Sequence, residues 1–430
     1  MTQAKEKKKR RLSRWDGQRG TALLCLLLLL GWSAGPLQAA VTVTTLPLVT
    51  TVSATSIIND NNQSNLSTGF TAINQAAVPV NVAATGVVSS AVDDNALYSR
   101  ILANVSTLST DLGLVSGNAP GSALASVNAQ SNISVTAHAE VNGSSVTSTL
   151  TNPGAGSAAS LAGNSIAAET SLNTTEQTVQ GAIDTTFDSS HAGRATVAAT
   201  SPLVDGDGGI FAGSAQFNLS VTPIANESNF AEVSGNSIAL TVGGTLGDSL
   251  SLEADANSIS AAFTGNNAKN LLAVETGGAT ALTSSAGIAN LQVNDGVAAT
   301  DSALTAESAI AASVLDNPLL TSSLSFEGNQ IKASATGSVA DNRLTVEAGL
   351  NVDADGDQQN RLDFTPGSES SVTRGGLFLN NMQLADGSPV SATATDPAAG
   401  AALSVDSRGL IDSTLHADGN SFEAIALGND

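Results

Sequence analysis

The chain has 430 residues, of which 16 are basic and 38 acidic, giving a formal net charge of −22 at pH 7. Only 3% of the residues are aromatic, and there is one cysteine. So acidic a chain is a poor match for nucleic acid or an anionic membrane surface. A single cysteine also excludes a framework of disulfides within one chain.

Residues 1–40 have the order of a secretory signal. A basic segment holds eight of the 16 Lys and Arg residues, the apolar run Ala22–Trp32 follows, and small residues end the segment at Ala39 and Ala40. The apolar run is shorter than the about 20 residues that span a bilayer. We therefore predict cleavage, with no membrane insertion after the signal is removed. The remaining chain would keep eight basic and 36 acidic residues, a net charge of −28, and no cysteine.

Residues 41–125 are predicted to form an N-terminal β region with one short helix. The helix is placed at Asp93–Leu108, where Asp93 or Asp94 can cap the first turn. Apolar residues recur there at helical spacing, at Leu97, Ile101, Leu102 and Val105. A second, Ala-rich segment, Ser302–Leu315, has a weaker helical pattern.

Residues 126–430 are predicted to be a β-strand repeat region. A motif close to Gly-Asn-Ser-Ile recurs, with its asparagine at Asn164, Asn236, Asn257, Asn329 and Asn420. In several copies a second polar residue follows 13 positions later, as in the step from Asn257 to Asn270. Apolar residues alternate in both halves, which is the pattern of strands, and the turn-forming segment Thr264–Asn267 separates the halves. Each unit is therefore predicted to be strand, turn, strand.

A longer period of 91–93 residues overlies the motif, and the 21 residues from Asn236 to Asn257 suit one two-sided rung. Stacked rungs would align asparagines in a ladder of amide hydrogen bonds; turn chemistry accounts for these residues equally well, and the two are compatible. Long segments such as Gly277–Leu324 would be irregular rungs or loops. The predicted fold is all-β, a β-solenoid-like stack of strand-turn-strand repeats. The alternative is a β-sandwich subunit with exchanged strands.

The pattern Gly235–Leu240, followed by Asp248–Leu252, resembles secreted β-strand-repeat proteins of Gram-negative bacteria and, more distantly, curli-type subunits. That resemblance implies a secreted protein, extracellular or on the cell surface, with a part in fibres, biofilm matrix or adhesion. Curli subunits are shorter, more regular and richer in Gln and aromatic residues. The long insertions here favour a folded subunit over self-templated amyloid.

Two acidic clusters are candidate Ca²⁺ sites. The first is Asp353, Asp355 and Asp357 with Asp363, and the second is Asp205 with Asp207. Alternate carboxylates around a glycine can turn their oxygens onto one cation, although the spacing of an EF-hand loop is not met. Solvated turns are the other interpretation, because Asp and Gly are ordinary turn residues.

Catalytic motifs are missing from the sequence, and the three histidines, His138, His191 and His416, lie far apart in unlike contexts. We predict a protein that is not an enzyme: a structural subunit of an extracellular filament, sheath or biofilm matrix that self-associates into a homopolymer. One alternative is a monomeric cell-surface adhesin or binding module with a surface or glycan ligand. The other is a polysaccharide-acting enzyme that uses the Asp clusters.

Overall fold

The structure is a computed structural model. It describes residues 40–45, 50–51, 57–66, 69–74, 79–86, 88–116, 119–120, 124–184, 187–188, 192–196, 203–207, 210–219, 229–276, 286–295, 300–304, 308–347, 359–364, 369–374, 377–386, 390–394 and 402–430. Only the backbone is described in β1, β2, β8, β14, β15, β16, β23, β28 and β29. Residues from Ala39 to Asp430 form one compact unit.

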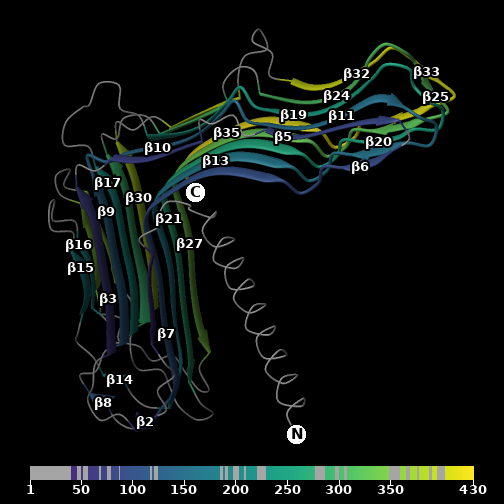
Figure 1. The fold of residues 1–430 in the computed structure, drawn as a ribbon. Helices are drawn as coiled ribbons and strands as arrows, with labels where there is room; N and C mark the ends of the chain where they lie inside the picture. Colours follow the sequence, from purple (N-terminus) through teal and green to yellow (C-terminus); the bar gives the residue numbers. More distant parts are fainter. Residues whose placement is uncertain are drawn as a thin grey trace, which may run out of the picture. The chain divides into compact units, whose positions relative to one another are not determined.

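The described chain is all-β, and five successive passes of it, called rungs here, stack on one another (Figure 1). Rung 1 consists of β3 (Ile57–Leu66), β4 (Gly69–Asn74), β5 (Pro79–Gly86), β6 (Ser89–Ala91) and β7 (Ala96–Ser116). Rung 2 consists of β9 (Leu124–Ile133), β10 (Thr136–Asn142), β11 (Ser145–Pro153), β12 (Ala158–Ser160) and β13 (Ser165–Asp184). Rung 3 consists of β17 (Ile210–Leu219), β18 (Asn229–Ser234), β19 (Ser237–Gly243), β20 (Ser251–Glu253) and β21 (Ser258–Thr276).

The last two rungs repeat this order with one short strand added. Rung 4 consists of β22 (Ala286–Asp295), β23 (Thr300–Leu304), β24 (Ala309–Val314), β25 (Leu319–Leu320), β26 (Ser323–Ser325) and β27 (Gln330–Glu347). Rung 5 consists of β30 (Leu377–Asp386), β31 (Val390–Ala394), β32 (Ala402–Ser407), β33 (Leu410–Ile411), β34 (Thr414–His416) and β35 (Ser421–Asn429). The segment Gly277–Leu324, predicted to be irregular, therefore contains most of a regular rung.

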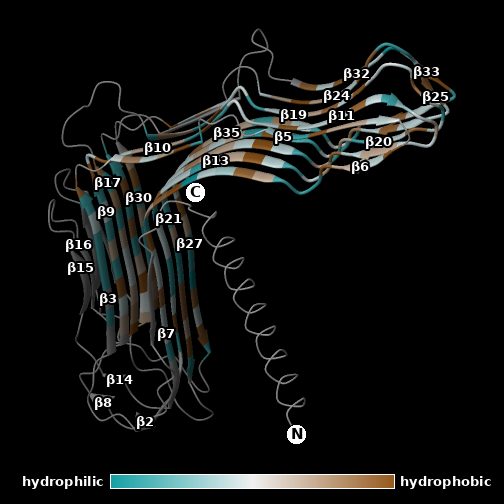
Figure 2. Cartoon of the chain, viewed as in Figure 1, coloured by the Kyte–Doolittle hydropathy of each residue, from teal (hydrophilic) through white to brown (hydrophobic). Residues whose placement is uncertain are grey.

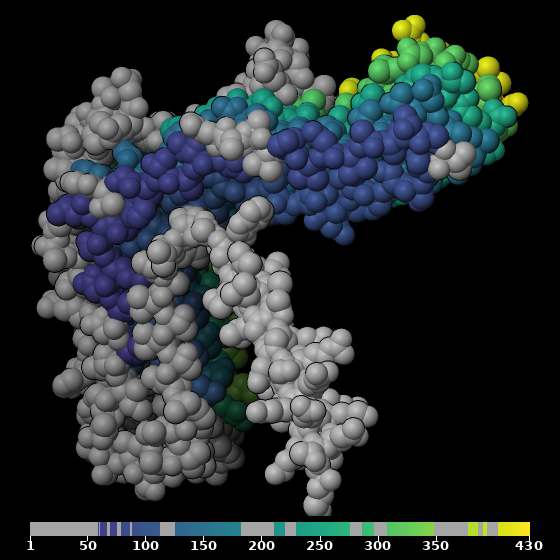
Figure 3. Space-filling model, viewed as in Figure 1, coloured from purple at the N-terminus to yellow at the C-terminus, as the bar shows by residue number. Residues whose placement is uncertain are grey.

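Each strand of a rung pairs in parallel with its equivalent in the next rung, as in the sheet β3-β9-β17-β22-β30. Figure 3 shows the result as successive bands of colour. Equivalent residues on neighbouring rungs form columns that run across all rungs. The predicted all-β, solenoid-like stack is confirmed.

The repeat length varies between rungs. The corner asparagines of successive rungs, Asn95, Asn164, Asn257, Asn329 and Asn420, are 69, 93, 72 and 91 residues apart. The 91–93-residue period thus matches two of the four steps. Asn236 lies in a different column, next to Ser144 and Ser308, so the predicted 21-residue rung is wrong. Asn236 and Asn257 are two corners of one rung.

The two longer steps contain inserted strands. β14 (Phe187–Asp188), β15 (Ala192–Thr196) and β16 (Leu203–Asp207) lie between rungs 2 and 3, and β28 (Gln359–Phe364) and β29 (Glu369–Arg374) lie between rungs 4 and 5. The two insertions join in one antiparallel sheet, β15-β16-β28-β29. This sheet, called the insert sheet, contacts β17 and β22. The short β14 pairs with β8 (Ala119–Pro120).

The unit predicted as strand, turn, strand is one long bent strand. These strands, called the long strands here, are β7, β13, β21 and β27. β21 and β27 pair on both sides of Gly265 and Gly337, but the register skips these two residues. In β27, Ile331, Ala333 and Ala335 are buried before the bend, whereas even-numbered residues face inward after it. The bend therefore shifts the inward-facing positions by one residue. It also divides the stack into two arms: the proximal arm holds the first half of each long strand, and the distal arm holds the second half (Figure 1).

The predicted helix at Asp93–Leu108 is wrong, because residues 96–108 of this segment are part of the strand β7 (Ala96–Ser116). The bend at Ala103 moves the inward positions from odd to even numbers. Residues 97, 101, 104 and 108 consequently share the interior at spacings of three and four, which imitates a helix. The Ser302–Leu315 segment is also extended, as β23 and β24.

The two arms have different interiors. In the proximal arm, the first halves of the long strands pack on β10, β11, β12 and their equivalents around a continuous apolar core that includes Ile166, Ile259 and Ile331. In the distal arm, the second halves face the β3-β9-β17-β22-β30 sheet across an interior that combines apolar residues such as Leu272 and Ile288 with buried amides. Figure 2 shows hydrophilic stretches on β3, β9 and β17 in this arm.

Two further strands lie at the N-terminal side of the long-strand sheet. β1 (Ala40–Thr45) pairs in parallel with Val105–Thr110 of β7, and β2 (Thr50–Thr51) pairs with Val115 and Ser116.

Candidate functional site

A ladder of glutamines crosses the interior of the distal arm through all five rungs. Its members are Gln63, Gln130, Gln216, Gln292 and Gln383. From Gln130 on, each Nε2 donates to Oε1 of the glutamine one rung earlier, at 2.8–2.9 Å. Each also donates to a backbone carbonyl of the facing long strand, as Gln292 does to Val339 at 2.7 Å. The buried amides are thus satisfied across the stack, as burial requires.

A double ladder of asparagines runs beside the glutamines. Asn132 and Asn218 lie on the short-strand side, and Asn173 and Asn266 on the long-strand side. Asn218 accepts from Asn132 and Asn173, each at 3.0 Å, and donates to Asn266 and Asn294. Side-chain hydrogen bonds join the two columns in rungs 1–4, so this part of the interior specifies the register of both sheets at once.

Four of the five asparagines singled out in the sequence form a third ladder at a corner of the proximal arm: Asn164, Asn257, Asn329 and Asn420. The backbone N and Nδ2 of Asn164 donate to Oδ1 of Asn257, at 3.1 and 3.0 Å, and Asn257 donates to Asn329 in the same way. Gly163, Gly328 and Gly419, which precede corner asparagines, have positive φ. The ladder and the turn interpretation are therefore both correct.

The sequence analysis missed the glutamine ladder, although a signal was present. Rungs 1, 2 and 4 carry Asn-x-Gln-x-Asn, at residues 61–65, 128–132 and 290–294, and rung 3 carries Ser-x-Gln-x-Asn at 214–218. The motif recurs with period two, so its polar residues share one face of a strand. That face is buried against the long strands.

Both ends of the stack are open in the part of the chain that is described. No described strand pairs with the outer edges of β3, β4, β5 and β6 at the N-terminal end. The same holds for the outer edges of β30, β31, β32, β34 and β35 at the C-terminal end. Side chains that are buried in middle rungs become exposed here: Ile331 is 0% exposed, whereas Phe422 in the same column is 45% exposed. Edges and apolar side chains of this kind favour further strand pairing.

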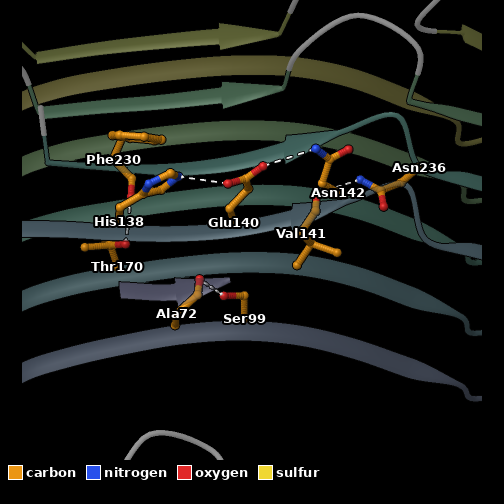
Figure 4. Close-up of polar contacts among 9 residues, drawn as sticks. All are labelled: Ala72, Ser99, His138, Glu140, Val141, Asn142, Thr170, Phe230 and Asn236. Carbon is orange, nitrogen blue, oxygen red and sulfur yellow. Dashed lines mark hydrogen bonds and ion pairs between the residues drawn. The ribbon is translucent and has the colours of Figure 1, made fainter. Parts of the chain in front are cut away.

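A separate polar group lies on β10 (Figure 4). His138 stacks on Phe230 with ring centroids 3.6 Å apart, and its Nε2 lies 3.4 Å from Oε2 of Glu140. Glu140 accepts a hydrogen bond from Nδ2 of Asn142 at 3.2 Å. Burial lowers the pKa of His138, and the nearby Glu140 carboxylate opposes that shift. The His138 ring is half-buried and tilted by 36° against Phe230, which is the geometry of a histidine packed against an aromatic neighbour.

The predicted Ca²⁺ ligands are only partly within the described chain. Asp353, Asp355 and Asp357 lie outside the described residues, and for Asp205, Asp207 and Asp363 the backbone alone is described. The insert sheet places Asp205 and Asp207 on β16 and Asp363 on the neighbouring strand β28: Leu203 pairs with Asp363, and Asp205 with Arg361 on one side and Arg194 on the other. Calcium binding stays a prediction.

The described side chains include no group of three or more His, Cys, Asp or Glu that could hold a metal ion. His138 and His416 are on different strands, and His191 lies outside the described residues. In the described chain, no helix is long and apolar enough to cross a membrane. No protein-family model, curated protein or solved structure matches this chain.

Proposed function

We propose that this protein is a structural subunit of an extracellular filament, sheath or biofilm matrix, whose copies assemble by pairing of β-strands. The observation that carries the proposal is the pair of open parallel edges at the two ends of the described stack. Strand edges of that length are normally covered, shortened or charged in proteins that stay monomeric. Here apolar side chains accompany them, among them Leu415, Phe422 and Leu427.

The site of action is part of the same proposal. The basic and apolar leader supports export, and the resemblance of the repeats supports the surface of a Gram-negative bacterium. A net charge of −28 after removal of the leader would keep free subunits soluble and slow their approach at low salt, where charges are poorly screened. Assembly is therefore best tested at physiological ionic strength.

The test is electron microscopy and sedimentation of the protein from Val41 onward at rising concentration. We expect uniform filaments. Stable monomers at high concentration, with and without Ca²⁺, would contradict the proposal.

A matched pair of variants tests whether the C-terminal edge is used. Leu415→Lys places a charge on β34 at that edge, whereas Leu315→Lys changes a residue that follows β24 within the stack. Both leucines are 41% exposed, so both variants should fold. We expect Leu415→Lys to lose assembly and Leu315→Lys to keep it. Equal assembly of the two variants would show that copies do not contact one another through the C-terminal edge at Leu415.

A monomeric adhesin is the second candidate, and the insert sheet favours it. The insertions after rungs 2 and 4 are far apart in the sequence, yet β16 pairs with β28. Loops and insertions carried by a rigid scaffold are a common place for binding specificity. Binding to cells or glycans by a protein that does not polymerise, lost when residues 348–376 are removed, would select this candidate.

A further inference from the structure

The C-terminal edge of the long-strand sheet has a step. β35 pairs with β27 only as far as Asn429 opposite Ser338, and the backbone N of Ala340 donates to the carbonyl of Asp430 at 2.9 Å. β27 itself continues to Glu347. No described strand covers residues 341–347 of β27.

The N-terminal edge of the same sheet has the opposite step. β1 pairs with Val105–Thr110 of β7 and adds one row to the distal arm alone. The columns of the sheet run from Val105 through Thr174 and Asn267 to Val339. β1 therefore occupies, at one end of the stack, the columns of residues 341–344, which no described strand covers at the other end.

We propose that copies of this chain join head to tail, and that β1 of each copy completes rung 5 of the copy before it. This inference rests on the proposed function, self-association, and specifies its geometry. When β35 of one copy pairs with β7 of the next, β27 and β7 are left two rows apart in the distal arm. The gap between β27 of one copy and β7 of the next is then two strand spacings of about 4.8 Å each. One further strand fits in that gap, and we assign β1 to it.

The register of the join follows from the columns. Val41 would pair with Ala340, Val43 with Asn342 and Thr45 with Leu344 of the preceding copy. These are inward-facing columns: in the rungs above, the column of Val43 holds Leu108, Gln177 and Asn270, all 0% exposed. Leu344 and Val346 are only partly buried beside the apolar cluster of the distal arm. β1 would bury Leu344, which lies opposite its last residue, Thr45.

The columns also explain where the two strands meet end to end. Asp430 follows Asn429 and lies in the column of Val105, which is the column of Ala40. Once residues 1–40 are removed, β1 of the next copy would begin at Val41, in the column after that of Asp430. Asp430 and Val41 would then lie in one row without occupying the same column.

The polarity of two ladders suits the same join. Each glutamine donates toward the rung before it, so Nε2 of Gln63 would face Oε1 of Gln383 in the preceding copy. Each corner asparagine donates toward the rung after it, so the backbone N of Asn420 would face Oδ1 of Asn95 in the following copy. A head-to-head contact would set donor against donor or acceptor against acceptor in these columns.

Engineered cysteines test the register directly, because the chain from Ala40 onward has none of its own. Thr44→Cys with Arg343→Cys places two thiols in one column, on β1 and β27. Within one copy they are four rows, about 19 Å, apart, beyond the about 7 Å that a disulfide allows between Cα atoms. Only a second copy can bring them together.

The expected result after mild oxidation is a series of disulfide-linked multimers on a non-reducing gel. The control, Thr44→Cys with Thr178→Cys, uses the same column at rung 2, two rows from β1, and should stay monomeric on the gel. Filaments that form without the Thr44–Arg343 crosslink would overturn the inference and leave the proposed function standing. Failure of the unmodified protein to assemble would instead refute the proposed function.

A shortened protein that begins at Thr50 is the second test. It lacks β1 but keeps every strand of rungs 1–5, and circular dichroism with urea unfolding shows whether it folds. We expect a folded protein whose assembly is lost. Assembly equal to that of the unshortened protein would show that β1 is not part of the join.

Discussion

Many side-chain amides in this protein are buried, and most of them keep hydrogen bonds to neighbouring rungs. Asn218, Gln216 and Asn173 are at most 1% exposed, yet each has hydrogen-bond partners on two or more neighbouring strands. Stacking makes this satisfaction feasible, because the same amide recurs at the distance of one hydrogen bond on every rung. The cost of burying each amide is offset only while the column stays complete.

Asn218→Ala tests that dependence. The change removes the acceptor of Asn132 and Asn173 and the donor to Asn266 and Asn294. We expect a loss of about 2 kcal/mol in the free energy of unfolding, since buried groups are left with fewer partners. Urea unfolding is the measurement, and Asn142→Ala, on an exposed residue, is the control. Equal effects of the two variants would contradict a special role for the ladder.

One column shows what an interruption does. Ser214 stands between Asn128 and Asn290, where the neighbouring rungs have asparagine. Among the described side chains, the hydroxyl of Ser214 and Oδ1 of Asn290 have no hydrogen-bond partner. The shorter serine cannot span one rung spacing, so the ladder is broken there while the glutamine column beside it is continuous.

His138 gives a pH dependence of stability. Burial lowers its pKa in the folded protein below the ordinary 6.5, although Glu140 opposes the shift. As the pH falls below 6.5, the unfolded chain takes up a proton at this histidine before the folded chain does. The unfolded state then binds more protons, so this contribution to stability is present at neutral pH and is lost on acidification.

His138→Gln should remove that component. We expect the urea midpoint of the unmodified protein to drop more than that of the variant between about pH 7.5 and about pH 5. His416→Gln, on the exposed strand β34, is the control and should behave like the unmodified protein. Identical pH dependence with and without His138 would contradict this assignment.

Among the elements, the long strands decide the architecture. Each begins in the proximal arm, bends once and continues in the distal arm, so one strand serves two interiors. At the bend, Gly265 and Gly337 lie against the next rung: an added Cβ at Gly265 would come within 2.5 Å of the carbonyl oxygen of Gly337. Close approach of backbones, rather than positive φ, accounts for glycine at these two positions.

Gly265→Ala is therefore expected to destabilise the fold by about 1–3 kcal/mol, because backbone must move to admit the methyl group. Gly428→Ala is a matched control, since it lies in the same column at rung 5 and its Cβ would meet nothing within 4 Å. Thermal unfolding of the two variants is the measurement. A stable Gly265→Ala protein would mean that the bend relaxes without cost.

At the scale of the whole molecule, the stack has a middle that is fully covered and two ends that are not. β22 is buried along nearly its whole length, whereas β34 is exposed throughout. In repeat architectures each unit depends on contacts with its neighbours, so terminal units need a cap or another copy. The proposed head-to-tail join would supply the second solution, with β1 as the piece that makes the two ends complementary.

The sequence by itself determined the all-β class and the corner asparagine ladder. These features follow from local periodicity, because side chains alternate along any strand and turns select Gly and Asn. It did not reveal the bend, since a change of inward face at Ala103 gives the same spacings as a helix. It also suggested a rung of 21 residues where the chain takes 69 to 93.

Tertiary structure alone decided which repeats share a column, how the insertions meet in one sheet, and which edges remain open. These are relations between residues about 70 to 90 positions apart, fixed when stacked amides and apolar side chains find one common register. Composition therefore predicts a strand stack, whereas only the stacked chain shows that Gln63 and Gln383 end one ladder and that β1 and β27 have matching steps.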